Sequence, residues 1–156
     1  MANYITKEGM DRLHRRIQVL IAERAIIIKQ VVEAREMGDL SENAEYHAAR
    51  EKQRSIENEF NRLRNRTGML QVIDPDTLQK DAARFGAKIC MKNEETSELV
   101  YLQLVGIDEI FDSEDGFVRT SILSPRGKAL IGKKVGDVVT VKAPKGNINF
   151  EILSIK

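Results

Sequence analysis

Apolar residues in the first half of the chain recur with the period of two long helices. From Met10 they follow alternating spacings of three and four residues, which is the heptad pattern of a coiled coil. Seven of the eight positions in this series are apolar: Met10, Leu13, Ile17, Leu20, Ile27, Val31 and Ala34. A second series holds Tyr46, Ala49, Ile56, Phe60, Leu63 and Leu70. The pattern predicts two amphipathic helices with a turn near Leu40.

The two apolar stripes are expected to pack against each other as an antiparallel coiled-coil hairpin. If the chain folds back at Leu40, Leu20 faces Phe60 and Ile17 faces Leu63. Arg24 and Gln53 interrupt the stripes, and such polar positions help to fix the register of a coiled coil. An arm of about 30 residues, at roughly 1.5 Å per residue, spans on the order of 45 Å. We therefore expect the turn at residues 38–43 to be the part of the chain most remote from any second domain.

The second half has the pattern of a small β domain. Residues 99–105, 137–142 and 148–153 are apolar or alternating stretches bounded by turn-forming residues, which predicts strands of an antiparallel sheet. Residues 125–131 form a short helical candidate, with Pro125 in its first turn and Gly132 after its end. The fold class predicted from both halves is α+β.

The boundary between the two halves is expected at Asp74-Pro75-Asp76, because a residue before proline disfavours the helical conformation. This places a helical hairpin with an acidic tip in residues 1–75 and the β domain in residues 76–156.

Composition narrows the possible function classes. The 156 residues carry 25 Lys and Arg against 24 Asp and Glu, a net charge of +1, which is too little to bind nucleic acid by bulk charge alone. The single cysteine, Cys90, rules out an intrachain disulfide and a thiolate zinc cluster. No apolar run approaches the roughly 18 residues of a membrane span, and Met1–Tyr4 lacks the features of a secretory signal. We expect a cytoplasmic protein without membrane contacts.

Asp39 and Glu42, in the turn of the hairpin, admit two interpretations. Their spacing suits a capping box at the start of the second helix, with Ser41 as an alternative cap. They could also complete a shared metal site, because magnesium is usually bound by one or two carboxylates together with substrate phosphates and water. In the second case the hairpin would finish the active centre of another enzyme.

Two segments resemble the Gre family of transcript-cleavage factors. Residues 33–51, which contain Gly38-Asp39-Leu40-Ser41-Glu42-Asn43, closely resemble the signature of that family, and residues 44–51 are similar to its GreA branch. Residues 124–133 resemble the second signature of the family. Related sequences commonly carry an apolar residue, alanine and arginine where this chain has Arg126, Gly127 and Lys128. The resemblance covers essentially the whole chain.

The resemblance implies a function on bacterial RNA polymerase. A Gre-type coiled coil enters the secondary channel of the polymerase, and an FKBP-like C-terminal domain docks at the rim of the channel. Asp39 and Glu42 match the acidic pair that helps to hold the second magnesium ion and to orient water. The polymerase itself then hydrolyses backtracked RNA and arrested complexes are rescued, so the factor is not an enzyme and has no cofactor of its own.

Further roles are expected of residues around the tip, from their positions on the hairpin, and of residues in the second domain, from the resemblance. Support of the tip is expected from Leu40, Ser41, Asn43 and Tyr46. Contacts with the RNA 3′ segment or with the channel walls are expected from Arg35, Arg50 and Arg54, unless these are solvated charges paired with neighbouring glutamates. Docking on the polymerase is expected from Ser124, Pro125 and Arg126. The partners implied are the polymerase, with its DNA, and the nascent RNA 3′ end, and the factor is expected to be a monomer.

Two other functions compete with this one. A channel-binding inhibitory paralogue could share the architecture without stimulating cleavage, although such relatives have altered acidic tips and this tip keeps Asp39 and Glu42. A peptidyl-prolyl isomerase is suggested by the FKBP-like resemblance alone. The low aromatic content, 5% with no tryptophan, disfavours an aromatic-lined proline pocket.

Overall fold

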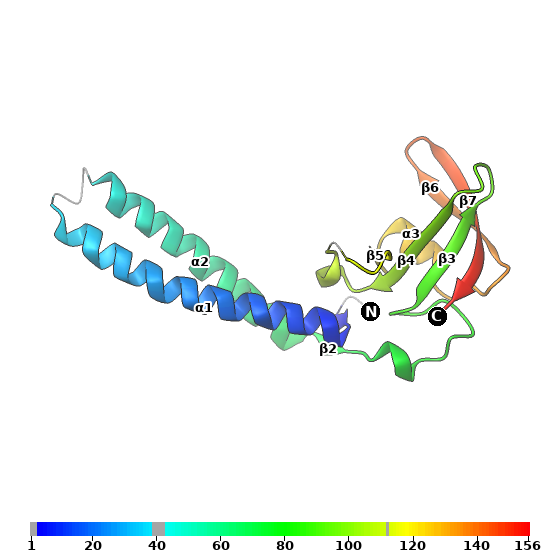
Figure 1. Ribbon diagram of the computed structural model, residues 1–156, viewed down its shortest axis with the longest axis horizontal. Coiled ribbons are helices and arrows are strands. Elements are labelled where there is room, and N and C mark those ends of the chain that lie inside the picture. The colour runs from blue at the N-terminus through cyan, green and yellow to red at the C-terminus, as the bar shows by residue number, and fades with distance from the viewer. Residues whose placement is uncertain (1–2, 39–42, 112) are drawn as a thin grey trace. The chain divides into compact units, whose positions relative to one another are not determined.

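The chain folds into two compact units. The computed structural model describes residues 3–38, 43–111 and 113–156. One unit is the helical hairpin of residues 10–70, and the other combines residues 71–156 with the first nine residues of the chain (Figure 1). The hairpin unit is thus shorter at both ends than the segment 1–75 that the sequence pattern suggests. No helix in the described part of the chain has the length and apolar character needed to cross a membrane.

The hairpin unit consists of α1, Lys7–Glu36, and α2, Ala44–Met69. Its core contains four buried residues, Leu20, Ile27, Ile56 and Leu63. Partly buried residues complete the stripe: Leu13, Ile17, Ala49 and Phe60. All eight are heptad positions, so the predicted antiparallel pairing of the two helices is confirmed. The 30 residues of α1 span about 45 Å.

Charged pairs flank the apolar stripe of the hairpin. Arg16 donates two hydrogen bonds of 2.9 Å to the Glu59 carboxylate. The hydrogen bonding from Arg16 holds the pKa of Glu59 below its usual value. Arg24 interrupts the stripe as predicted, and its Nε lies 2.7 Å from Glu57 Oε1 while its guanidinium lies 5.8 Å from the centre of the Phe60 ring. These pairs join α1 to α2 and support a single register.

The second unit contains a five-stranded sheet with the order β5-β4-β3-β7-β6. Its strands are β3 (Lys88–Asn93), β4 (Leu99–Val105), β5 (Val118–Ser121), β6 (Val138–Ala143) and β7 (Gly146–Ile155). The predicted strands at 99–105, 137–142 and 148–153 correspond to β4, β6 and β7. Neither β3 nor β5 was identified from the sequence pattern, because β3 lacks clear alternation and β5 is only four residues long.

The prediction of a purely antiparallel sheet is wrong at one edge. β5 runs parallel to β4, with Leu102 opposite Val118 and Val105 opposite Ser121. About a dozen residues connect β4 to β5 and return the chain to the same end of the sheet. A parallel connection requires about this length. The connecting segment contains a short 3-10 helix, η2 (Ile107–Glu109). The sheet is therefore mixed, and the α+β class is confirmed.

A short helix, α3 (Pro125–Leu130), closes the core of this unit. Leu130 is fully buried together with Ile122 and the inward-facing residues of the sheet, which include Leu102, Leu104 and Ile152. Ser124 caps the helix and Pro125 occupies its first turn, as the sequence predicted. A second 3-10 helix, η1 (Pro75–Thr77), lies in the connection that leads into β3.

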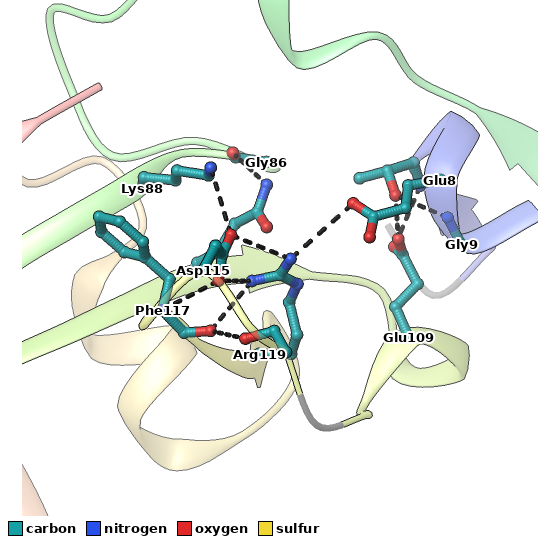
Figure 2. Close-up of polar contacts among 11 residues, drawn as sticks. Glu8, Gly9, Gly86, Lys88, Glu109, Asp115, Phe117 and Arg119 are labelled. Carbon is teal, nitrogen blue, oxygen red and sulfur yellow. Dashed lines mark hydrogen bonds and ion pairs between the residues drawn. The ribbon is translucent and has the colours of Figure 1, made fainter. Parts of the chain in front are cut away.

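The beginning of α1 is attached to this unit by a buried carboxylate. β1 (Tyr4–Ile5) pairs in parallel with β2 (Gln71–Val72). The Glu109 carboxylate, 1% exposed, accepts hydrogen bonds from the main-chain N–H groups of Thr6 at 3.0 Å and Gly106 at 2.9 Å, and from the Thr6 hydroxyl. Glu109 reaches towards the first turn of α1, where Gly9 lies (Figure 2). A Cβ at Gly9 would collide with this carboxylate. The contact therefore depends on a glycine in the first turn of α1.

Candidate functional site

The candidate acidic site is the connection between α1 and α2. Asp39, Leu40, Ser41 and Glu42 lie outside the described residues, so the site is built from the helix ends on either side. Within the described part of the chain, no group of three or more His, Cys, Asp and Glu side chains could hold a metal ion. The predicted magnesium site, at Asp39 and Glu42, stays a prediction.

Asn43 forms the cap of α2. Its Oδ1 accepts a hydrogen bond of 3.0 Å from Tyr46 N, and its Nδ2 donates one of 2.6 Å to the carbonyl of Ala34. The Asn43 side chain thus forms a hydrogen bond with one N–H group in the first turn of α2 and with one carbonyl in the last turn of α1, which the helices themselves leave unpaired. The interpretation of Asp39 or Ser41 as the cap of the second helix is wrong, because α2 begins at Ala44 and Asn43 occupies the cap position.

Tyr46 and Arg35 form a second bridge between the helix ends. Arg35 Nη2 lies 3.5 Å from the Tyr46 hydroxyl, and the guanidinium lies 5.7 Å from the centre of the Tyr46 ring. The hydrogen bond from Arg35 lowers the pKa of Tyr46. Asn43 and Tyr46 thus both connect α1 to α2 next to the connecting turn, and their role in shaping that turn stays a prediction.

The three predicted basic residues, Arg35, Arg50 and Arg54, all lower the pKa of Tyr46. The positive charges of Arg50 and Arg54 add to that of Arg35 in lowering the pKa of Tyr46. Arg50 donates a hydrogen bond of 2.9 Å to Gln53, and Arg54 forms an exposed ion pair of 2.9 Å with Glu51. Exposed pairs of this kind contribute little to stability. The predicted contacts of Arg50 and Arg54 with RNA or with the channel walls stay a prediction.

The predicted docking residues lie at the start of α3. The Ser124 hydroxyl donates a hydrogen bond of 2.6 Å to the carbonyl of Ser121 and accepts one of 3.0 Å from Gly127 N. The Arg126 guanidinium lies 5.5 Å from the centre of the Phe150 ring. A Cβ at Gly127 would collide with the carbonyl of Ser121. The backbone of Ser121 and Ile122 thus leaves room only for a glycine at this position.

An ion pair between a buried arginine and an exposed aspartate in the second unit was not identified from the sequence. Arg119, whose side chain is 5% exposed, binds both carboxylate oxygens of Asp115 at 3.1 and 3.2 Å and donates to the carbonyl of Phe117 at 2.9 Å (Figure 2). Lys88 Nζ lies 3.3 Å from Asp115, and Glu8 lies 3.8 Å from Arg119. The hydrogen bonds from Arg119 hold the pKa of Asp115 far below its usual range. The only signal in the sequence was the spacing of four residues between Asp115 and Arg119.

Comparison with known proteins supports one family over the whole chain. The family description "Transcription elongation factor, N-terminal" matches residues 3–72, and "Transcription elongation factor, GreA/GreB, C-term" matches residues 78–156. Transcription elongation factor GreA of Thermodesulfovibrio yellowstonii is 48% identical over 152 residues, which cover 97% of this chain and 94% of that protein. GreA of Rhodospirillum rubrum is 44% identical, with 97% and 96% covered.

Among solved structures, GreA factor homolog 1 (Gfh1) of Thermus thermophilus matches with 23% identity and a TM-score of 0.45, covering 100% of this chain and 99% of that one. The curated relatives do not favour the inhibitory or the isomerase alternative, since they are named GreA. With both domain descriptions matched and relatives close to half identical over almost their full length, this chain belongs to the GreA/GreB family of transcription elongation factors.

Proposed function

We propose that this chain enters the secondary channel of bacterial RNA polymerase and stimulates the polymerase's own cleavage of backtracked RNA. The observation that carries this proposal is the position of two carboxylates, Asp39 and Glu42, in the turn between helices that each span several turns. Asn43 caps α2, so neither carboxylate is needed for that purpose. We propose that both serve chemistry outside this chain.

Asp39 and Glu42 would act as ligands of a magnesium ion shared with the polymerase. Their chemistry fits this ion, because magnesium accepts one or two carboxylates and completes its shell with phosphate oxygens and water. When bound, such an ion activates water for attack on a phosphodiester. Two carboxylates cannot hold the ion alone, so the phosphates and remaining ligands come from the polymerase and its RNA. The factor itself is then not an enzyme.

The basic residues beside the turn would orient the RNA. Arg35, Arg50 and Arg54 all act on the Tyr46 hydroxyl, so their charges converge next to the acidic turn. A guanidinium can bind a phosphate through two parallel hydrogen bonds. Contacts with phosphates position a nucleic acid without reading its sequence, which suits a factor that acts wherever the polymerase backtracks.

The C-terminal unit would dock at the rim of the channel through the segment that begins α3. Ser124 and Pro125 are held rigidly by the cap of this helix, while Arg126 extends over the ring of Phe150. An FKBP-like domain at this position would act as an anchor. In this role the chain would act as a monomer in the cytoplasm.

A stalled elongation complex provides the direct test. A polymerase backtracked on a defined template, with RNA labelled at its 3′ end, is mixed with the full chain and magnesium. Release of short labelled fragments, followed by renewed extension of the shortened RNA, is expected. Binding without any release of fragments would instead identify an inhibitor of the channel.

A further inference from the structure

A cavity in the C-terminal unit is separate from every residue assigned above to the turn or to docking. It has a volume of about 290 Å³ and lies between the segment that precedes β3 and the strand β4. This is close to the lower end of the roughly 300–1,000 Å³ found for small-molecule sites. Apolar walls are provided by Pro75, Leu78 and Phe85. A bare phosphate would leave much of this volume unfilled.

Gln103 lines this cavity, and part of its side-chain amide has no hydrogen-bond partner in the described residues. The residue is 8% exposed, and its Nε2 donates a hydrogen bond of 3.1 Å to the carbonyl of Gly86. Gly86 adopts a positive φ of 83° and packs against Pro75, which holds this carbonyl in place. In the described part of the chain the Gln103 side chain makes no other hydrogen bond. One amide hydrogen and the carbonyl oxygen are left for a ligand.

Cationic side chains surround the opening of the cavity. Lys80, Arg84, Lys88 and Lys156 line it, against one carboxylate, Asp76. Arg84 is paired with Asp81 at 3.1 Å and Lys88 with Asp115 at 3.3 Å. Lys80 is exposed and forms no ion pair with any residue in the ranges 3–38, 43–111 and 113–156. An anionic group at the opening would therefore meet the exposed ammonium group of Lys80 and the exposed guanidinium of Arg84.

We propose that this cavity binds a nucleoside phosphate. A glutamine amide with one donor and one acceptor free matches the adjacent donor and acceptor at the edge of a base, such as N6 and N7 of adenine. Gln103 binds the base in the interior, and Lys80 and Arg84 bind the phosphate groups at the opening. The inference does not depend on the proposed action on RNA polymerase.

Nuclear magnetic resonance of the full chain labelled with nitrogen-15 tests the proposal without polymerase. ATP is titrated into the protein, and adenosine and inorganic triphosphate are titrated separately. ATP is expected to shift the side-chain amide signals of Gln103 in a saturable manner and to bind more tightly than either fragment. Triphosphate binding as tightly as ATP, or no saturable shift up to millimolar ATP, overturns the proposal.

Two pairs of substitutions separate a built site from general attraction between charges. Lys80→Ala with Arg84→Ala is expected to weaken ATP binding at least about tenfold, because two charged hydrogen bonds are lost. Lys142→Ala with Lys145→Ala removes the same charge from exposed positions on β6 and its turn, outside the cavity, and is expected to leave the affinity unchanged. Equal weakening in both variants contradicts the proposal.

Gln103→Leu tests the contact with the base. This variant is expected to bind ATP no more tightly than inorganic triphosphate, since the amide is lost while the cations remain. Undiminished ATP binding by Gln103→Leu overturns the proposal. If Gln103→Leu fails to fold, the comparison between the Lys80/Arg84 and the Lys142/Lys145 double variants still decides the question. These side chains are exposed, so their replacement should not prevent folding.

Discussion

At the scale of single residues, the carboxylates of the turn should be separable from the folding of the hairpin. Replacing Asp39 with Asn and Glu42 with Gln keeps the size of each side chain and removes the charge that a magnesium ion needs. We expect stimulated RNA cleavage to fall to the level of polymerase alone, while binding to the polymerase is retained. Cleavage assays and competition binding measure the two quantities.

A thermal melt is the control for this variant. Asn43 supplies the cap of α2, so the midpoint of unfolding should hardly change. Full stimulation of cleavage by the double variant would remove Asp39 and Glu42 from the mechanism.

Replacing Asn43, in contrast, should lower the stability of the protein. Asn43→Ala removes the hydrogen bonds to Tyr46 N and to the carbonyl of Ala34. We expect the free energy of unfolding to fall by about 1 kcal/mol, as for other caps. Denaturant unfolding followed by circular dichroism gives the value. Asn61→Ala, at an exposed position within α2, is the matched control and should not destabilise the protein.

The ion pair between Arg119 and Asp115 should make the C-terminal unit sensitive to acid. Asp115→Asn removes the carboxylate that Arg119 binds most closely and leaves Glu8, 3.8 Å away, as the remaining carboxylate neighbour. We expect it to lower the free energy of unfolding by at most about 1 kcal/mol, because the Asp115 side chain is 34% exposed. The folded-state pKa of Asp115 lies below its unfolded value, because Arg119 favours the charged form. The stabilisation is therefore complete above the unfolded pKa of about 3.9 and is lost as the pH falls from there towards the lower folded-state pKa.

Unfolding curves at neutral pH and near pH 2 measure this dependence. The difference in stability between the wild type and Asp115→Asn should shrink at the acidic end. A difference that stays constant across this pH range would show that the charge of Asp115 is not what stabilises the contact.

At the scale of secondary-structure elements, the length of the hairpin should determine whether the turn reaches the RNA. Removing residues 20–26 together with residues 54–60 deletes one heptad from each helix, which keeps the apolar stripe in phase and shortens the arm by roughly 10 Å. Magnesium demands ligand distances of about 2 Å, so carboxylates withdrawn this far cannot reach it. We expect stimulated cleavage to vanish while the protein still binds the polymerase.

Circular dichroism must first show that the shortened hairpin keeps its helicity. A deletion of residues 20–26 alone leaves the two helices unequal in length and shifts their pairing by one heptad, which makes it a useful contrast. Full cleavage by the shortened, folded protein would contradict the proposal that the hairpin delivers the carboxylates.

At the scale of the whole molecule, cleavage should require the polymerase. The chain alone, mixed with RNA and magnesium, is expected to show no nuclease activity, because two carboxylates lack the further ligands of a phosphoryl-transfer site. Gel analysis of end-labelled RNA measures this. Cleavage that disappears in the Asp39→Asn, Glu42→Gln variant would show that the protein is itself a nuclease.

The sequence alone determined the hairpin and the class of the fold. A heptad stripe records which face of a helix is buried, so Leu20, Ile27, Ile56 and Leu63 could be recognised as core from their spacing. Alternating segments likewise predicted β4, β6 and β7. The acidic turn was recognised as a candidate site from the residue types and from its place between two helices.

Only the tertiary structure decided which distant residues meet. The parallel pairing of β5 with β4 depends on the path of a connection that has no periodic pattern. Glu109 binds Thr6 across 103 positions, and Gln103 faces a cavity formed with residues around Pro75. Local patterns report the burial of a face, whereas these contacts arise from packing between segments far apart in the chain. For the same reason the spacing offered Asp39 or Ser41 as a cap of α2, although Asn43 occupies that position and also reaches the carbonyl of Ala34 on the facing helix.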